Sequence, residues 1–190
     1  MKKIAIFASG SGSNVQRIIE YFNDKKELLQ ISIILANKSD AYVLQRAKNF
    51  NIPTFIFNSK ELKDSFLVFD KLKEFKIDYV ILAGFLLKVP DKILKEYSNK
   101  IINIHPALLP KYGGKGMYGM HVHSAVIEAG EKESGITIHY VNEHYDEGQI
   151  IFQAKCSIVS SDTPETLAQK IHSLEYEHFP VVIEKLIKQL

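Results

Sequence analysis

The stretch Ile101-Ile102-Asn103-Ile104-His105-Pro106 is the part of this chain that decides its fold. Its apolar residues predict a buried strand over residues 101–105, and Pro106 ends that strand because proline cannot donate to a sheet ladder. Side chains alternate along a strand, so Asn103 and His105 leave it on the same face. An amide can stabilise a developing oxyanion, and an imidazole can move a proton. The pair therefore favours a site for acyl transfer.

Strands and helices alternate on either side of this stretch. Their order predicts an α/β fold, a doubly wound, mostly parallel sheet flanked by helices with right-handed crossovers. Such sheets bind ligands at the carboxyl ends of their strands, where Asn103 and His105 would lie. The predicted strands cover residues 3–8, 31–36, 54–57, 79–83 and 101–105, followed by a late hairpin of residues 134–141 and 149–158. The predicted helices cover residues 14–22, 41–50, 62–75, 91–97, 121–129 and 163–190.

Two of these helices carry more detailed expectations. In the helix over residues 62–75, the spacing of Phe66, Phe69, Leu72 and Phe75 predicts one apolar face. The long C-terminal helix is opened by the cap-like Asp162-Thr163-Pro164-Glu165, and Pro180 should kink or break it.

Length and composition restrict the class of protein. With 190 residues, of which 46% are hydrophobic, we expect residues 1–190 to form one well-buried domain. A net charge of +2 without a basic stripe makes nucleic acid an unfavourable partner. No apolar run approaches the ~20 residues that span a bilayer, and the first strand is too short for a signal peptide. We therefore expect a cytoplasmic protein that binds no membrane. The single Cys156 excludes an internal disulfide framework and is expected to be a buried thiol.

A glycine-rich turn, Ser9-Gly10-Ser11-Gly12-Ser13-Asn14, joins the first strand to the first helix. Its free N–H groups at a helix start predict an anion site. A third glycine at the dinucleotide spacing, an acid after the second strand and the lysine of a P-loop are all missing. The turn therefore predicts a site for one phosphate, and the alternative is an ordinary turn with a helix cap.

Other polar groups could complete a site beside His105. Asp146, in a turn of the late hairpin, is the best candidate for orienting the imidazole, although such turns are also common without function. His121 and His123 could contribute to a zinc site, cap the following helix or approach a ligand, and no further ligand pattern supports the metal. The segment of residues 83–90 after the fourth strand could flank a flat aromatic ligand.

Together these motifs resemble the family of folate-dependent glycinamide ribonucleotide (phosphoribosylglycinamide) formyltransferases. The resemblance covers nearly the whole chain. Its most specific part, Asn103-Ile104-His105-Pro106 with Leu108-Leu109-Pro110, is typical of enzymes that handle formyl-tetrahydrofolate. The matching segments are residues 6–14, 36–38, 82–85, 102–112 and 135–141, followed by Asp146.

The resemblance implies that a formyl group passes from 10-formyltetrahydrofolate, the co-substrate, to the amine of glycinamide ribonucleotide in purine biosynthesis. Asn103 and protonated His105 would stabilise the tetrahedral oxyanion. Asp146 would hold the charged imidazole and help a water carry the proton from the amine to the departing folate nitrogen.

The resemblance also implies the binding residues and the partners. The ribonucleotide phosphate would rest on Gly12, Ser13 and Asn14, and the ribose hydroxyls would bind Glu175. The implied folate-binding residues are Leu86, Leu87, Lys88 and Val89 on one side of the pterin, and Asn142, Glu143, His144 and Tyr145 on the other. The implied partners are these small molecules only, without a metal, for a monomer or a homodimer.

Two features depart from the family pattern. Leu87 stands where the family commonly has a basic residue, and Lys88 lies one place further on. Residues 114–120 are an insertion that should form a longer flap.

Four alternatives to this interpretation differ in their chemistry. Methionyl-tRNA formyltransferases add a basic C-terminal domain, whereas this nearly neutral chain ends at its last predicted helix. Formyl-tetrahydrofolate hydrolases carry an N-terminal regulatory domain, whereas the first strand here begins near Lys2. The others are a non-catalytic sugar-phosphate binding module and a zinc hydrolase.

Overall fold

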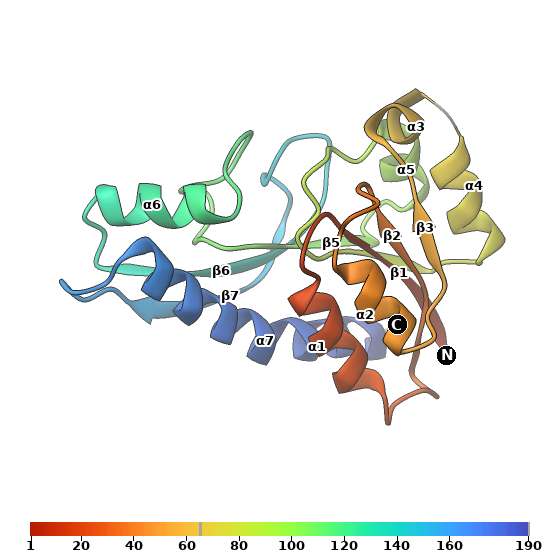
Figure 1. Cartoon of the computed structure of the whole chain (residues 1–190), viewed down its shortest axis with the longest axis horizontal. Coiled ribbons are helices and arrows are strands. Elements are labelled where there is room, and N and C mark those ends of the chain that lie inside the picture. The colour runs from red at the N-terminus through yellow and green to blue at the C-terminus, as the bar shows by residue number, and fades with distance from the viewer. Residues whose placement is uncertain (65, 190) are drawn as a thin grey trace.

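A computed structural model describes residues 1–64 and 66–189. Within those ranges it contains a seven-stranded sheet in the order β3-β2-β1-β4-β5-β6-β7, with the first five strands parallel and the last two antiparallel (Figure 1). The strands are β1 Lys2–Ala8, β2 Leu29–Ala36, β3 Thr54–Ile56, β4 Tyr79–Leu82, β5 Ile101–His105, β6 Glu133–Tyr140 and β7 Ile150–Ser157. The helices are α1 Ser13–Phe22, α2 Val43–Asn49, α3 Ser59–Asp64, α4 Leu67–Glu74, α5 Asp91–Glu96, α6 Met120–Glu128 and α7 Pro164–Lys188. The predicted doubly wound sheet is confirmed.

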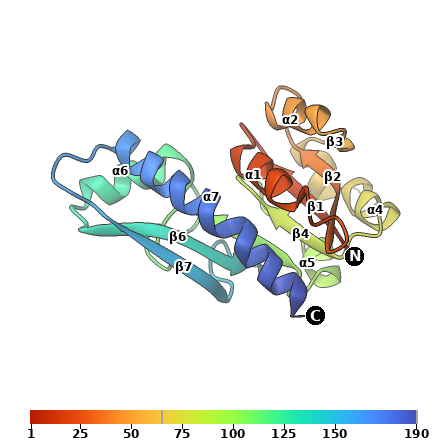
Figure 2. The ribbon, with the colours of Figure 1, turned by 90° about the horizontal axis from the view of Figure 1, so that it is seen from below.

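Two hydrophobic clusters cover the two faces of the sheet, because the central strands are apolar on both sides. Along β1, Ile4, Ile6 and Ala8 join one cluster, whereas Ala5 and Phe7 join the other. Helices α1, α2, α6 and α7 contribute to the first cluster, and α3, α4 and α5 contribute to the second (Figure 2). Burial of each aliphatic side chain contributes about 1.5–3 kcal/mol to the stability of the fold. The two clusters together therefore hold β1, β4 and β5 in place.

The single helix predicted over residues 62–75 is wrong, since the structure has α3 and α4 in its place, and Ser65 lies outside the described residues. Phe66 was expected on the buried face but is 64% exposed. In α4 the buried residues are instead Val68 and Leu72, four positions apart. With two short helices, Leu62 and then Val68 can pack on the same cluster, which one continuous helix would not allow.

Helix α7 begins with a capping box, as predicted. Thr163 Oγ1 accepts from the Thr166 backbone N–H at 3.3 Å, and the Thr163 N–H donates to Thr166 Oγ1 at 2.9 Å. Pro164 occupies the first turn, where its missing N–H has no helical partner in any case.

Pro180 does not break α7, so the expectation of a break is wrong, and that of a kink stays a prediction. The helix continues from Pro164 to Lys188, and residue 190 of the predicted range lies outside the described part of the chain. A proline inside a helix removes one backbone hydrogen bond. Here Pro180 is buried beside Phe179 and Ile183, and the packing of this turn against the rest of the core holds the helix in place. Across the described ranges, no helix has the length and apolar character needed to cross a membrane.

Candidate active site

A cleft of about 710 Å³ lies at the carboxyl ends of β1, β4 and β5. The loop after β1, the segment after β4 and the end of β5 form its floor. Further walls come from three segments: the flap, which is the loop of residues 106–119 between β5 and α6, the loop between β6 and β7, and α7. The residues predicted for catalysis, Asn103, His105 and Asp146, border this one cleft together with Gly12, Ser13, Asn14 and Glu175.

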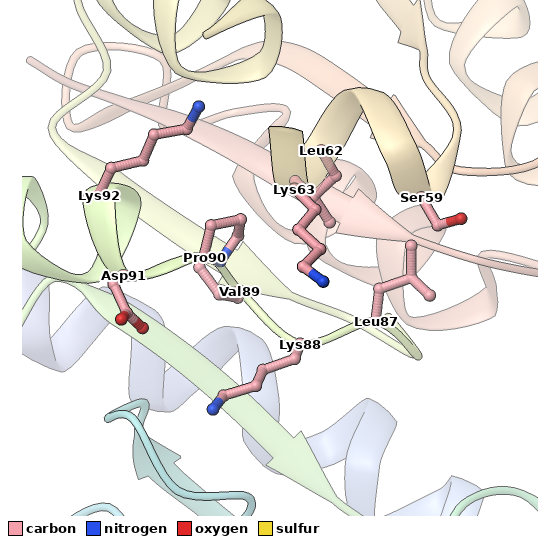
Figure 3. A pocket seen from close by; sticks show the side chains of 9 residues that line it. All are labelled: Ser59, Leu62, Lys63, Leu87, Lys88, Val89, Pro90, Asp91 and Lys92. Atoms are coloured by element: carbon pink, nitrogen blue, oxygen red, sulfur yellow. The ribbon is translucent and has the colours of Figure 1, made fainter. Parts of the chain in front are cut away.

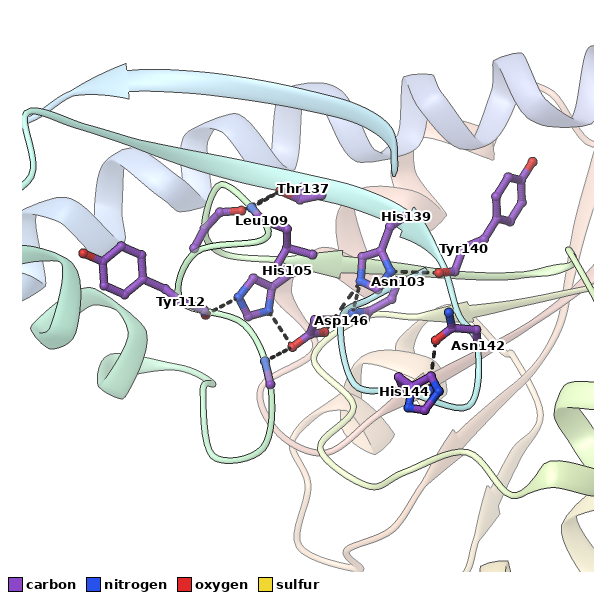
Figure 4. A network of polar contacts seen from close by, with 12 residues as sticks. Asn103, His105, Leu109, Tyr112, Thr137, His139, Tyr140, Asn142, His144 and Asp146 are labelled. Atoms are coloured by element: carbon purple, nitrogen blue, oxygen red, sulfur yellow. Dashed lines mark hydrogen bonds and ion pairs between the residues drawn. The ribbon is translucent and has the colours of Figure 1, made fainter. Parts of the chain in front are cut away.

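His105 is held by the flap and by the late loop (Figure 4). Its side chain is buried, with Nε2 2.8 Å from the carbonyl oxygen of Tyr112 and Nδ1 3.6 Å from Oδ2 of Asp146. A carbonyl only accepts, so Nε2 carries the proton and Nδ1 faces the carboxylate. Burial lowers the pKa of His105, and the nearby Asp146 carboxylate and the Tyr112 carbonyl oppose that shift only in part. The ring can therefore take up a proton at Nδ1 when negative charge develops beside it.

Asp146 faces His105 from the loop between β6 and β7. Its Oδ2 accepts from the Gly114 N–H at 2.9 Å, and its backbone is left-handed, with φ of 57°. Burial alone would raise the pKa of Asp146, but the surroundings of the carboxylate, among them the His105 ring and the Gly114 N–H, lower it. The carboxylate is thus ionised and placed to stabilise a protonated His105.

Asn103 contacts a second histidine that sequence reasoning missed. Its Nδ2 lies 3.0 Å from Nε2 of His139, which comes from β6 directly opposite in the antiparallel pairing. Thr137, two residues earlier, accepts from the Leu109 N–H and donates to the Ala107 carbonyl, so it ties down the loop after His105. The pattern of residues 135–141 indicates a strand, but only the pairing register could have placed His139 beside Asn103.

The glycine turn leads into α1 through Gly12, whose φ is 70°. A Cβ at this position would lie 2.4 Å from Cγ2 of Val43, so only glycine fits. No side chain caps α1, which leaves the first N–H groups of the helix without a side-chain partner beside the cleft. An unpaired helix N-terminus of this kind suits an anion.

Glu175 connects α7 to that turn. It is 5% exposed, and its Oε2 accepts from Asn14 Nδ2 at 2.9 Å and lies 3.0 Å from His172 Nδ1. The hydrogen bond to Glu175 raises the pKa of His172. Because Oε2 already has two partners, Oε1 is the oxygen available to a ligand hydroxyl.

The two histidines of the H-x-H pair have different environments. His121 packs edge-on against the Tyr118 ring, whereas His123 is buried, borders the cleft and has an unpartnered Nδ1. Burial lowers the pKa of His123. The cap position of α6 is Gly119, so neither histidine caps the helix. In the described ranges, no group of three or more His, Cys, Asp or Glu side chains could hold a metal ion.

The residues implied for folate binding do not all border the cleft. Leu86 and Tyr145 do, whereas Leu87, Lys88 and Val89 line a second cavity of about 560 Å³ against α3 and the start of α5 (Figure 3). Asn142, Glu143 and His144 line neither. In that loop Asn142 Oδ1 accepts from the His144 N–H at 3.0 Å, which shapes the chain on its way to Asp146.

Cys156 is half-buried on β7, away from this cleft. Burial raises the pKa of its thiol, which keeps it protonated and a weak nucleophile.

Comparisons with known proteins match this chain to the same family over nearly its whole length. Residues 2–183 match the formyl transferase family model. A phosphoribosylglycinamide formyltransferase of Bacillus subtilis is 39% identical over 191 residues, covering 98% of this chain and 95% of that protein. A chloroplastic phosphoribosylglycinamide formyltransferase of Arabidopsis thaliana is 40% identical over 98% of this chain, which spans 67% of the plant protein. The crystal structure of phosphoribosylglycinamide formyltransferase from Bacillus halodurans is 38% identical and superposes with a TM-score of 0.88, covering 98% of this chain and 95% of that chain. The chain belongs to the formyl transferase family.

Proposed function

We propose that this protein transfers the formyl group of 10-formyltetrahydrofolate to the amine of glycinamide ribonucleotide, a step of purine biosynthesis, and that residues 1–190 act as one formyltransferase domain. The carrying observation is that Asn103, His105 and Asp146 meet at one end of a cleft whose other walls are the glycine turn and Glu175. A reaction centre and an anion site therefore share one cavity, as a phosphorylated acceptor requires.

The acceptor binds along the floor of this cleft. Its phosphate accepts hydrogen bonds from the N–H groups of Gly12, Ser13 and Asn14, where the helix dipole also favours negative charge. Its ribose hydroxyls donate to Glu175. These two anchors direct the amine of the glycinamide arm toward Asn103 and His105.

The chemistry is an acyl transfer between two nitrogens. The amine nitrogen attacks the formyl carbon, and the Asn103 amide and a protonated His105 stabilise the resulting oxyanion. Asp146 stabilises the imidazolium, and a water beside it carries one proton from the attacking amine to N10 of the folate. The carbon–N10 bond then breaks, which releases tetrahydrofolate and the formylated ribonucleotide.

The folate binds on the side of the second cavity. The pterin lies between Leu86–Val89 and the loop of residues 142–145, where backbone groups can recognise its edge. The second cavity is lined by Lys63, Lys88 and Lys92, which suits the carboxylates of a folate tail. Lys88, one position after Leu87, is the basic residue of this segment that lines the second cavity. No metal takes part in this scheme.

The alternative function is hydrolysis of formyl-tetrahydrofolate by the same catalytic residues, with water in place of the amine. The unpaired start of α1 and the buried Glu175 favour transfer, because a hydrolase needs neither of them. A cytoplasmic location and a monomeric or homodimeric state stay predictions.

The test is formyl transfer by the purified protein with and without glycinamide ribonucleotide. We expect turnover only when the ribonucleotide is present, and a loss of about 100- to 1,000-fold in kcat for Asn103→Ala, which removes an oxyanion donor. Asn49→Ala, an exposed position on α2, is the matched control and should retain the full rate. Formate release at the same rate without the ribonucleotide would establish the hydrolase instead.

A further inference from the structure

We propose that His139 is a positioning residue that orients the Asn103 amide toward the oxyanion. This inference rests on the proposed formyl transfer, and it assigns a role to a buried histidine that the mechanism above leaves unused. The side chain of His139 is 2% exposed and lies at the centre of the polar network in Figure 4.

The tautomer of His139 follows from its first partner. Nδ1 lies 2.8 Å from the backbone carbonyl of Tyr140, and a carbonyl oxygen only accepts, so Nδ1 carries the hydrogen. In the neutral ring, Nε2 is then an acceptor. Its partner at 3.0 Å is the side chain of Asn103, which must present its NH2 group rather than its oxygen.

This contact determines which end of the Asn103 amide is held in place. An amide without such a partner can turn by 180° and exchange its oxygen with its nitrogen. An oxygen presented to the reacting carbonyl would repel a developing negative charge, whereas an N–H would stabilise it. The bond to His139 uses one N–H of the amide and leaves the second, on the same nitrogen, for the oxyanion in the cleft.

The backbone around His139 is built for this arrangement. The pairing of β6 with β7 has an irregularity between Ile138 and His139, and such bulges re-aim side chains beside active sites. A Cβ on Gly148 would lie 1.7 Å from the Tyr140 carbonyl oxygen and 3.5 Å from Nδ1 of His139. Glycine at position 148 therefore makes room for the carbonyl that determines the tautomer.

His139 also has a second polar neighbour, because Nε2 lies 3.6 Å from Oδ1 of Asp146. That separation is beyond hydrogen-bond distance, whereas the contact with Asn103 is within it. We therefore infer that His139 acts on Asn103 and not on Asp146. A double-mutant cycle of His139 with Asn103 tests this assignment.

The experiment compares His139→Gln with His139→Asn in the full chain. A glutamine side chain reaches the position of Nε2 with an acceptor oxygen, whereas an asparagine side chain reaches only the position of Nδ1. We expect His139→Asn to lower kcat by about 100-fold, the cost of one misdirected oxyanion donor, while the KM values for both substrates stay within about threefold. His139→Gln should retain kcat within about tenfold of the native protein. Equal losses for the two variants would overturn the proposal.

The cycle adds Asn103→Ala to each variant. If His139 acts through Asn103, then Asn103→Ala/His139→Asn should be no more than about threefold slower than Asn103→Ala alone. Losses that multiply would show that His139 acts elsewhere, and the proposal would fail while the proposed function stands. Full activity of Asn103→Ala alone would instead remove the proposed catalytic centre. Both glutamine and asparagine are polar and smaller than histidine, and melting curves of each variant show whether the fold is kept.

Discussion

At the scale of single residues, alternation along a strand places Asn103 and His105 together, and the structure confirms it. Their orientation comes from groups outside this strand. The Tyr112 carbonyl determines which nitrogen of His105 carries the proton, and the Gly114 N–H donates to the Asp146 carboxylate. The chemistry of the pair is thus decided by backbone atoms of the flap and by a neighbouring strand.

Protonation of these residues couples to stability. Burial lowers the pKa of His105 from 6.5, so the unfolded chain binds a proton before the folded protein does. The free energy of unfolding therefore falls as the pH drops below about 6.5, by at most about 1.4 kcal/mol per pH unit for this one group. The lowered pKa of Asp146 acts with the same sign in the more acidic range below 3.8.

Denaturant unfolding of the native protein and of His105→Gln between pH 5 and pH 8 measures the contribution of His105 to the pH dependence of the free energy of unfolding. We expect the native protein to gain stability relative to the variant as the pH rises. His172, whose raised pKa has the opposite sign and whose stabilisation is lost as the pH rises, is present in both proteins and cancels in the difference. Parallel curves for the two proteins would contradict the burial of an uncharged His105.

At the scale of elements, the glycine turn shows how a loop positions a ligand group. Gly12→Ala requires a left-handed alanine, which costs about 1–2 kcal/mol, and its Cβ would collide with Val43. We expect a KM for glycinamide ribonucleotide at least about tenfold higher and a KM for formyl-folate near the native value, because the collision displaces the N–H groups that hold the phosphate.

Gly10→Ala is the matched control, because Gly10 lies in the same turn with ordinary φ and nothing within 4 Å of an added Cβ. It should behave as the native protein does. Equal KM values for glycinamide ribonucleotide in the two variants would show that the phosphate does not bind at this turn.

The sequence predicted where helices lie along the chain better than which of their side chains are buried. Periodicity predicted one apolar helix over residues 62–75, but the division into α3 and α4 changes which side chains are buried. Pro180 shows the converse, since a strong local signal for a break is overridden by the packing of the buried face of α7 on the core. In both cases tertiary contacts outweigh local preference, because each buried aliphatic side chain is worth as much as a helix hydrogen bond.

At the scale of the whole molecule, the catalytic cleft and the lysine-lined cavity are two separate spaces, bordered by the consecutive residues Leu86 and Leu87. If the folate tail occupies the second, Lys88→Glu should raise the KM for formyl-folate by about 5- to 20-fold, since it replaces attraction by repulsion near the tail. The KM for the ribonucleotide should stay unchanged, and the effect should weaken at high salt.

Lys95→Glu carries the same change of charge on the exposed side of α5, outside the cavity lining, and should leave both KM values near native. A similar rise in both variants would indicate a general effect of net charge and would place the tail elsewhere.

Local periodicity, and the conformations that glycine and proline allow, were enough to predict the sheet, the edge at which the cleft lies and the shared face of Asn103 and His105, and they led to the expectation of an anion at the glycine turn. Asp146 was a candidate from its turn alone, whereas Glu175 was implied only by the resemblance. Only the tertiary structure decided that His139 faces Asn103, that Tyr112 and Gly114 of the flap hold His105 and Asp146, and that Leu87–Val89 line a separate cavity. Most of those contacts join segments far apart in the chain. They depend on strand register and loop packing, which arise from the summed burial of the core.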